Sequence, residues 1–534
     1  MTRYLLIWST FFGATCVYRH GGNISITFVQ NAFPEKVAKV LRILVHAICL
    51  VLFAVLLYYG CMYTGKLTKT ATALPIKMKY VFVCIPISMA ILMFHAFWMR
   101  FWQNPMQKRR SRADGCNSLC RIPGAAGHRR AVAFSICSAA AVTMFAGYGG
   151  SKMMIVVQRM FQSCDSFSLI AVPFFILAGD LLAKGKISKV LVEFCESFLG
   201  MIRGGLSVVS VLAGMFFAAI SGSGAATTAA VGATLVPELK KRGYREDSAA
   251  ALVAAAGTIG VVIPPSVPMV LYAVIAEESV NRLFKVGFMP GILMGAILIA
   301  IALWQAYKWK YPKGATFSIK NIAKTFLKTI PAILMPLIIL GGFFSGYFTP
   351  SEAAAVAVIY AVLVSVFVYR DLTPKALFQI MLGSAKTSAV IMIIIACSGP
   401  FGWALANWKI PETICSAVLA ISQNKYIFMM LISIIILIAG VFMETSSAII
   451  ILTPVFLPLV RALGVSTLHF GILFVVGIAI GMITPPVAIN LFVATGITGL
   501  PIEKISKSVV PYLIGLILVF LAIVFVPLIV PGLL

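Results

Sequence analysis

The chain is short of charged residues, and acidic ones are the scarcest. Charged residues make up 11% of its 534 residues, with 16 Asp and Glu against 43 Lys and Arg. A soluble protein of this length needs far more charge on its surface. Hydrophobic residues make up 61%, so the composition predicts a polytopic membrane protein. The net charge of +27 then marks cytoplasmic loops rather than a nucleic-acid surface, since no separate basic, aromatic-rich domain is present.

The sequence also lacks the common motifs of enzymes and metalloproteins. It contains no CxxC pair, no HExxH and no GxxxxGK[ST] loop, and its five histidines show no ligand spacing. The 11 cysteines are scattered, many of them in apolar runs, where they are expected to pack as small apolar residues. An intramembrane serine hydrolase would need Ser223 beside a base such as His469, and no sequence feature brings the two together. We therefore expect no enzyme and no cofactor.

Changes in composition divide the chain into three parts. Apolar spans at 38–60 and 79–102 lie in a small N-terminal domain, residues 1–103. A junction at 104–143 follows, and its first part, 104–130, carries seven Lys or Arg. Residues 144–534 then form a large domain of many apolar spans, which predicts an all-α polytopic fold.

The large domain contains an internal repeat. Five positions recur at one constant offset in the sequence, without a gap: Pro237 and Pro458, Gly243 and Gly464, Gly260 and Gly481, Pro264 and Pro485, Pro265 and Pro486. We call this spacing the repeat offset. Inverted repeats with interrupted apolar segments in corresponding places are typical of secondary transporters, and the interruptions indicate the binding site.

The first interrupted segment of each repeat is small and polar: "SGSGAATT" (221–228) and "METSSA" (443–448). Such segments are expected to form re-entrant hairpins, whose non-helical tips survive at membrane depth only inside protein or beside water. Close helix packing is the alternative for the small residues alone. Two interpretations of Glu444 stay open: a functional ionisable residue, or a carboxylate favoured by the dipole at a helix N-terminus.

The second interrupted segment of each repeat is a span broken by paired prolines: "GTIGVVIPPSVP" (257–268) and "GMITPPVAIN" (481–490). The predicted helix-break residues are Pro264, Pro265, Pro485 and Pro486. A break frees carbonyls that suit a hard cation, and the half-helix after it presents N–H groups that suit an anion. A simple kink is the alternative for a lone proline. One hairpin tip and one break in each repeat would form a cage of oxygens, so the two repeats predict at least two Na⁺ sites with an anionic substrate between them.

At these motifs the sequence resembles a known family. "PFFILAGDLL" (173–182), "SGSGAATTAAVG" (221–232), "GTIGVVIPPSVPMVLYA" (257–273) and "GMITPPVAINLF" (481–492) are similar to the large membrane subunit (DctM-like) of a tripartite ATP-independent periplasmic (TRAP) transporter. The first hundred residues resemble its small membrane subunit (DctQ-like). The fused arrangement is familiar among sialic acid carriers but is not confined to them.

The resemblance implies a function and a mechanism. The chain would be a multi-pass permease in the lipid of a bacterial inner membrane. A sodium gradient would drive uptake of an organic acid, of the C4-dicarboxylate or sialic acid class, which a periplasmic solute-binding protein delivers. The fold would be of the elevator type, in which two hairpins and two broken helices slide against a scaffold that the small subunit extends.

The resemblance also assigns residues. The sodium-binding residues would be Ser221, Gly222, Gly257 and Gly260 in the first repeat, and Thr445, Ser447, Gly481 and Thr484 in the second. The substrate-binding residues would be Ser223, Ser266 and Ser446.

The sequence departs from the family in two places. The small-subunit part begins at what should be its second helix, so its first helix is expected to be missing. Residues 104–143 do not follow the family pattern, which favours either a frame-shifted stretch or a genuine basic linker. The alternatives to a TRAP permease are a receptor-independent sodium/carboxylate symporter and an inactive copy.

Overall fold

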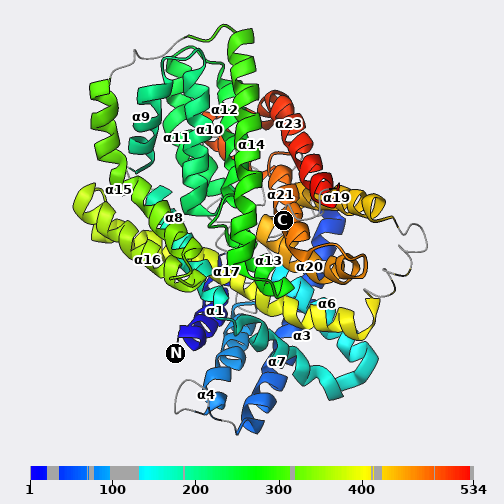
Figure 1. The fold of residues 1–534 in the computed structure, drawn as a ribbon. Helices are drawn as coiled ribbons and strands as arrows, with labels where there is room; N and C mark the ends of the chain where they lie inside the picture. The colour runs from blue at the N-terminus through cyan, green and yellow to red at the C-terminus, as the bar shows by residue number, and fades with distance from the viewer. Residues whose placement is uncertain are drawn as a thin grey trace. The chain divides into compact units, whose positions relative to one another are not determined.

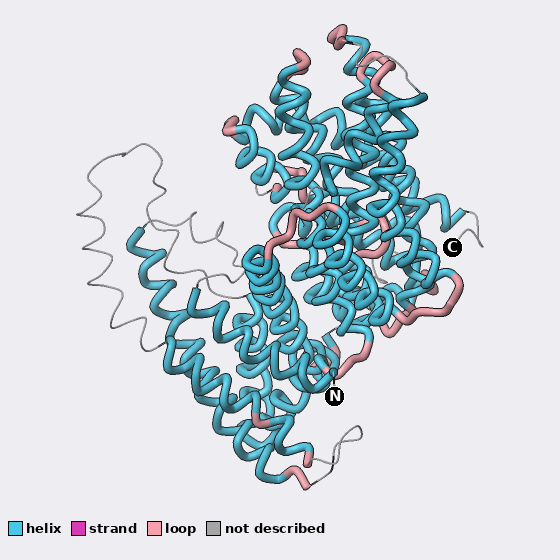
Figure 2. Tube along the Cα trace, turned by 90° about the vertical axis from the view of Figure 1, so that its left-hand side faces the viewer, coloured by secondary structure: helices cyan, strands magenta, loops and turns pink. Residues whose placement is uncertain are grey.

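The structure, a computed structural model, is helical throughout the part that it describes. The described residues are 2–20, 35–68, 70, 77–96, 132–183, 187–312, 319–410, 413, 416, 424–485 and 488–529. Within these ranges no strand occurs (Figure 2). Thr70 and Lys77 form only an isolated bridge. Nine helices of this part are long and apolar enough to cross a membrane. The predicted all-α polytopic fold is therefore confirmed, whereas most of the basic junction, residues 104–131, lies outside the described residues.

The chain forms two compact units, residues 1–166 with 385–410, and residues 167–384 with 411–534. The division in space differs from the sequence division at 103 and 144, which stays a prediction. Unit 1 contains α1 (Thr2–His20), α3 (Glu35–Lys66), α4 (Met78–Phe82), α6 (Val132–Tyr148), α7 (Met153–Cys164) and the later part of α17 (Pro374–Asn407). In its core, α3 packs on α6 and α7, and the rings of Tyr18, Phe53 and Phe134 meet edge to face.

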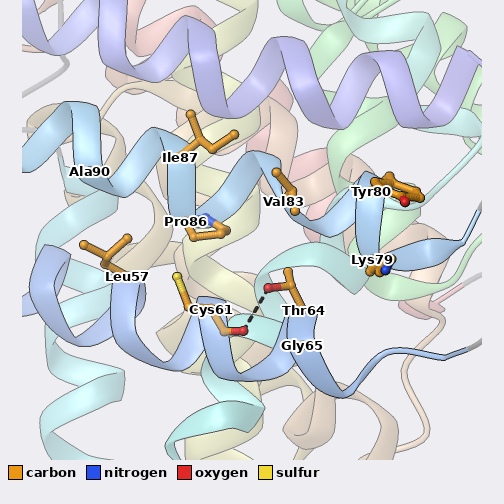
Figure 3. Close-up of a pocket in the computed structure, with 10 residues that line it drawn as sticks. All are labelled: Leu57, Cys61, Thr64, Gly65, Lys79, Tyr80, Val83, Pro86, Ile87 and Ala90. Atoms are coloured by element: carbon orange, nitrogen blue, oxygen red, sulfur yellow. Dashed lines mark hydrogen bonds between the residues drawn. The ribbon is translucent and has the colours of Figure 1, made fainter.

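A groove of 530 Å³ opens on unit 1 between α3 and the span Met78–Ala96 (Figure 3). Its walls are apolar except for Thr64, Lys79 and Tyr80. The Thr64 hydroxyl donates to carbonyls of its own helix. The groove therefore offers none of the clustered oxygens that the sequence predicts for a cation site.

Unit 2 contains the repeat. Its first α-helices are α8 (Ala171–Ala183) and α9 (Ile187–Leu199). The first repeat follows with α10 (Gly205–Ser221), α11 (Gly224–Lys241), α12 (Glu246–Thr258), α13 (Val267–Ala276) and α14 (Val280–Lys308). Between the repeats lie α15 (Ile319–Phe344), α16 (Pro350–Leu363), a π-helical turn (Val364–Val368) and the start of α17. The second repeat has α19 (Lys425–Phe442), α20 (Thr445–Ala462), α21 (Thr467–Gly481), α22 (Ile489–Thr498) and α23 (Ile502–Ile529).

The helix ends follow the repeat offset found in the sequence. Both ends of α11 and α20 correspond at this offset, as do the last residues of α10 and α19 and the first residues of α12 and α21. Gly243 (φ 80°) and Gly464 (φ 65°) close α11 and α20 in the left-handed region, which glycine enters without strain. The residue after each glycine donates its N–H to the carbonyl five positions earlier. The same local chemistry thus ends both hairpins.

The two repeats differ in how their helices pack. In the first repeat, α10, α11 and α12 contact one another along their lengths and α14 joins them (Figure 1). In the second repeat, α19 packs chiefly against α21 and touches α20 little.

At the end of α11, partial burial would lower the pKa of the Arg242 guanidinium, but the carboxylates of Glu196 and Glu238 raise it above its ordinary value.

Candidate functional site

The tip of the first hairpin is a two-residue break in the chain. Gly222 (φ 60°) ends α10 in the left-handed region, and Ser223 caps α11 by accepting a hydrogen bond from the N–H of Ala226 at 3.5 Å. Serine is favoured at this position because its side chain satisfies a free N–H of the first turn. The hydroxyls of Ser221 and Thr227 lie 2.9 Å apart and both residues are buried. The tip is therefore a small cluster of hydroxyl and carbonyl oxygens.

The first break separates α12 from α13. After Thr258 a short 3₁₀ turn (Ile259–Val261) leads through Pro264 and Pro265 to Ser266, which caps α13. The Ser266 hydroxyl donates to the carbonyl of Val261 and accepts from the N–H of Met269 at 3.4 Å. Ser266 is fully buried, so in this conformation its hydroxyl is committed to the backbone.

The first tip and the first break touch through glycines. A β-carbon built on Gly260 would lie 2.6 Å from Thr227 Oγ1 and 2.7 Å from the carbonyl oxygen of Ser223. One built on Gly222 would lie 2.8 Å from the carbonyl oxygen of Pro265. These distances are too short for any side chain, so glycine is what allows the oxygens of tip and break to approach. The structure thus brings together the predicted residues of the first repeat.

The tip of the second hairpin is organised by a carboxylate. Glu444 caps α20, accepting from the N–H of Ser447 at 3.1 Å and from the hydroxyl of Ser446 at 3.1 Å. The hydroxyl of Ser447 lies 3.4 Å from the same carboxylate, and the hydroxyl of Thr445 contacts Met482 Sδ at 3.4 Å. Glu444 therefore occupies a helix N-terminus, where the dipole stabilises its charge.

The second break lies between α21 and α22. A β-carbon on Gly481 would lie 2.2 Å from the backbone carbon of Gly440, so α19 and α21 are in backbone contact here. The Thr484 hydroxyl donates to the carbonyl of Ile480 at 2.9 Å, and Pro485 is exposed. The predicted break residue Pro486 lies outside the described residues. Ala488 (φ 36°) leads into α22.

Residues that the sequence interpretation missed join the two repeats. Met482 contacts Thr445, and its methyl would lie 2.8 Å from a β-carbon on Gly224. Asn490 of α22 donates its side-chain N–H to the carbonyl of Ala254 at 3.2 Å, and its backbone N–H to the carbonyl of Met482 at 3.0 Å. The sequence did offer a signal for Asn490, because its polar side-chain amide stands at the start of an apolar segment. Nothing in the sequence distinguishes Met482.

Chemically, the arrangement offers neutral oxygens rather than acids. No group of three His, Cys, Asp or Glu is close enough to hold a metal ion in the part of the chain that the structure describes. Hydroxyls and carbonyls suit a hard cation such as Na⁺. The N-termini of α11, α13, α20 and α22 present partial positive charge, which favours an anion. Together with the paired hairpins and broken helices, these features define a polytopic membrane transporter with an internal repeat.

The chain belongs to the TRAP transporter permeases. Residues 126–529 match the family model of the tripartite ATP-independent periplasmic transporter DctM component, and residues 1–104 match that of the DctQ component. It is thus a multi-pass inner-membrane protein, and its relatives are permeases rather than enzymes.

Several relatives carry functional names. The isethionate TRAP transporter permease protein DctMQ of Oleidesulfovibrio alaskensis is 40% identical over 402 residues, which cover 74% of this chain and 62% of that protein. The match therefore spans less than two thirds of that relative. The C4-dicarboxylate TRAP transporter large permease protein DctM of Pseudomonas aeruginosa is 39% identical, covering 69% of this chain and 86% of its own. The sialic acid TRAP transporter large permease protein SiaM of Vibrio cholerae is 33% identical, covering 68% and 85%.

A solved structure shares the fold. The crystal structure of the Alcanivorax borkumensis YdaH transporter matches with a TM-score of 0.54 at 14% sequence identity, covering 72% of this chain and 88% of that one. At this identity the likeness concerns the fold alone, and it agrees with the polytopic transporter architecture.

Proposed function

We propose that this chain carries an organic anion across the inner membrane, driven by a sodium gradient and supplied by a periplasmic solute-binding protein. The observation that carries the proposal is the contact of the first hairpin tip with the first break, where Gly222 and Gly260 bring hydroxyl and carbonyl oxygens together. Buried neutral oxygens can replace part of the hydration shell of Na⁺, which prefers such ligands.

In this proposal the two tip–break junctions bind the coupling ions. Their residues are Ser221, Gly222, Gly257 and Gly260 in the first repeat, and Thr445, Ser447, Gly481 and Thr484 in the second. The substrate anion lies between them, near Ser223, Ser266 and Ser446 and the helix N-termini. The hairpins and broken helices move as a transport domain against a scaffold.

The substrate class is proposed from chemistry shared by the named relatives. Isethionate, C4-dicarboxylates and sialic acid each carry at least one sulfonate or carboxylate group, which helix N-termini and serine hydroxyls can bind. We therefore propose a small organic acid with one such anionic group at the site.

Uptake into proteoliposomes tests the function. Purified permease should take up a labelled organic acid only with an inward sodium gradient and an added solute-binding protein; a potassium gradient of the same size is the control. Uptake without the receptor would favour the stand-alone symporter, and no uptake by folded protein would favour an inactive copy.

Ser266→Ala tests the substrate role against a purely structural one. Because Ser266 caps α13, its loss is expected to cost about 1 kcal/mol of stability. If it also binds substrate, KM should rise roughly tenfold.

Ser466→Ala is the matched control for this change. Ser466 caps α21 by accepting from the N–H of His469 at 3.4 Å, the same distance as in the Ser266 cap. Ser266→Ala should lose more stability than Ser466→Ala, because it also removes the hydrogen bond to the buried Val261 carbonyl, and only Ser266→Ala should change KM. An equal KM in the two variants would leave Ser266 as a helix cap alone.

A further inference from the structure

Two fully buried polar side chains hold oxygens with no hydrogen-bond partner. Thr228 on α11 and Asn490 on α22 are both 0% exposed. Among the described residues, Thr228 Oγ1 and Asn490 Oδ1 make no hydrogen bond. The Asn490 amide nitrogen is already used, since it donates to the carbonyl of Ala254. Buried polar groups almost always have hydrogen-bond partners. Two buried oxygens without partners, from two distant segments, therefore need an explanation.

Both side chains meet the backbone of Gly257. A β-carbon built there would lie 1.8 Å from Thr228 Oγ1 and 3.1 Å from the Asn490 amide nitrogen. It would also lie 3.0 Å from the carbonyl oxygen of Gly224. The absence of a side chain at Gly257 therefore lets a hydroxyl, an amide and a carbonyl converge from α11, α12 and α22. These helices belong to both repeats, so this point lies where the repeats join.

The repeat itself supplies a comparison. At the repeat offset, Thr228 corresponds to Ile449, Gly257 to Ile478 and Asn490 to Met269. Ala254, whose carbonyl binds Asn490, corresponds to Val475. All of these counterparts are apolar and buried. The fold accepts an apolar core at the equivalent place, so packing does not require polar residues at Thr228 and Asn490.

We infer that Thr228 Oγ1 and Asn490 Oδ1 are ligands of an additional Na⁺ site at the junction of the repeats, which adjoins the first tip–break junction at Gly257. The inference rests on the proposed function and deepens it. The atoms without a hydrogen-bond partner are oxygens, which can coordinate a cation. The Thr228 hydroxyl hydrogen is the one remaining donor of this pair that could bind an anion. Gly257 lies in the last turn of α12, where the helix dipole is negative and favours a cation. The nearby carbonyl of Gly224 adds a third neutral oxygen.

Sodium binding to the purified protein tests the site directly. The measurements are the number of radioactive sodium ions bound per chain and the melting temperature across a sodium titration, with potassium keeping ionic strength constant. Thr228→Val removes the hydroxyl and keeps the shape, and Asn490→Met installs the residue of the other repeat. Each variant should bind one sodium ion fewer per chain. The sodium concentration that gives half of the maximal rise in melting temperature should increase roughly tenfold.

Thr453→Val is the matched control. Thr453 on α20 is also 0% exposed, and its hydroxyl is also unpaired among the described residues. Its loss should leave sodium binding unchanged. If Asn490→Met does not fold, the sodium stoichiometry of Thr228→Val decides.

Two outcomes overturn the inference, and they are distinguishable. Wild-type stoichiometry in folded Thr228→Val and Asn490→Met would mean that the pair binds water or nothing, while sodium coupling stands. A wild-type protein that shows neither sodium binding nor sodium-dependent uptake would contradict the proposed function as well.

Discussion

Gly481→Ala is expected to abolish uptake and to destabilise the protein by roughly 3 kcal/mol or more. The new β-carbon would lie 2.2 Å from the Gly440 backbone carbon and 2.5 Å from both its Cα and its carbonyl oxygen. All three are main-chain atoms, so no side-chain rotation can relieve the overlap. The helices α19 and α21 would have to separate at the place where the second break begins. Melting temperature and proteoliposome uptake measure the two effects.

Gly496→Ala is the control for this change. It lies in α22, and a β-carbon there meets no atom within 4 Å. Alanine loses less conformational freedom than glycine in a helix, so this variant should be as stable as the wild type or slightly more so. Normal uptake by Gly481→Ala would show that close contact of α19 and α21 is not needed for transport.

Ser221→Ala is expected to raise the sodium concentration for half-maximal uptake roughly tenfold. Its hydroxyl lies 2.9 Å from Thr227 Oγ1 at the first tip. Removal would not leave Thr227 unpaired, because that hydroxyl also donates to the carbonyl of Ser223 at 2.9 Å. The N–H of Ser223, which donates to the Ser221 hydroxyl at 3.4 Å, would lose this partner. We therefore expect a stability loss of about 1 kcal/mol while sodium affinity falls. Initial uptake rates measured across a sodium series at constant ionic strength check the prediction.

Ser210→Ala provides a matched control on the same helix. Ser210 is fully buried on α10 and donates to the carbonyl of Leu206 at 2.9 Å. It is away from the tip, so its loss should leave the sodium dependence unchanged. Equal sodium curves for Ser221→Ala and the wild type would remove Ser221 from the proposed ion site.

Much of the fold could be predicted because its signals are local. The scarcity of charge and the apolar spans predict a polytopic membrane protein, since the bilayer admits little else. The ends of α11 and α20 follow the repeat offset, because a corresponding glycine, Gly243 or Gly464, ends each helix through local backbone contacts. The cap formed by Ser266 was also within reach of the sequence, as a serine just before a Val-Pro helix start.

The membrane class, the repeat and the positions of the breaks could be read from residue types along the chain. Which oxygens meet depends on the packing of helices that are distant in sequence. Gly257 contacts Thr228 nearby in the chain, but it also contacts Asn490, which belongs to the other repeat. Gly481 approaches the backbone of Gly440 on α19. Such contacts depend on how whole helices pack, and no local pattern of residue types carries that information.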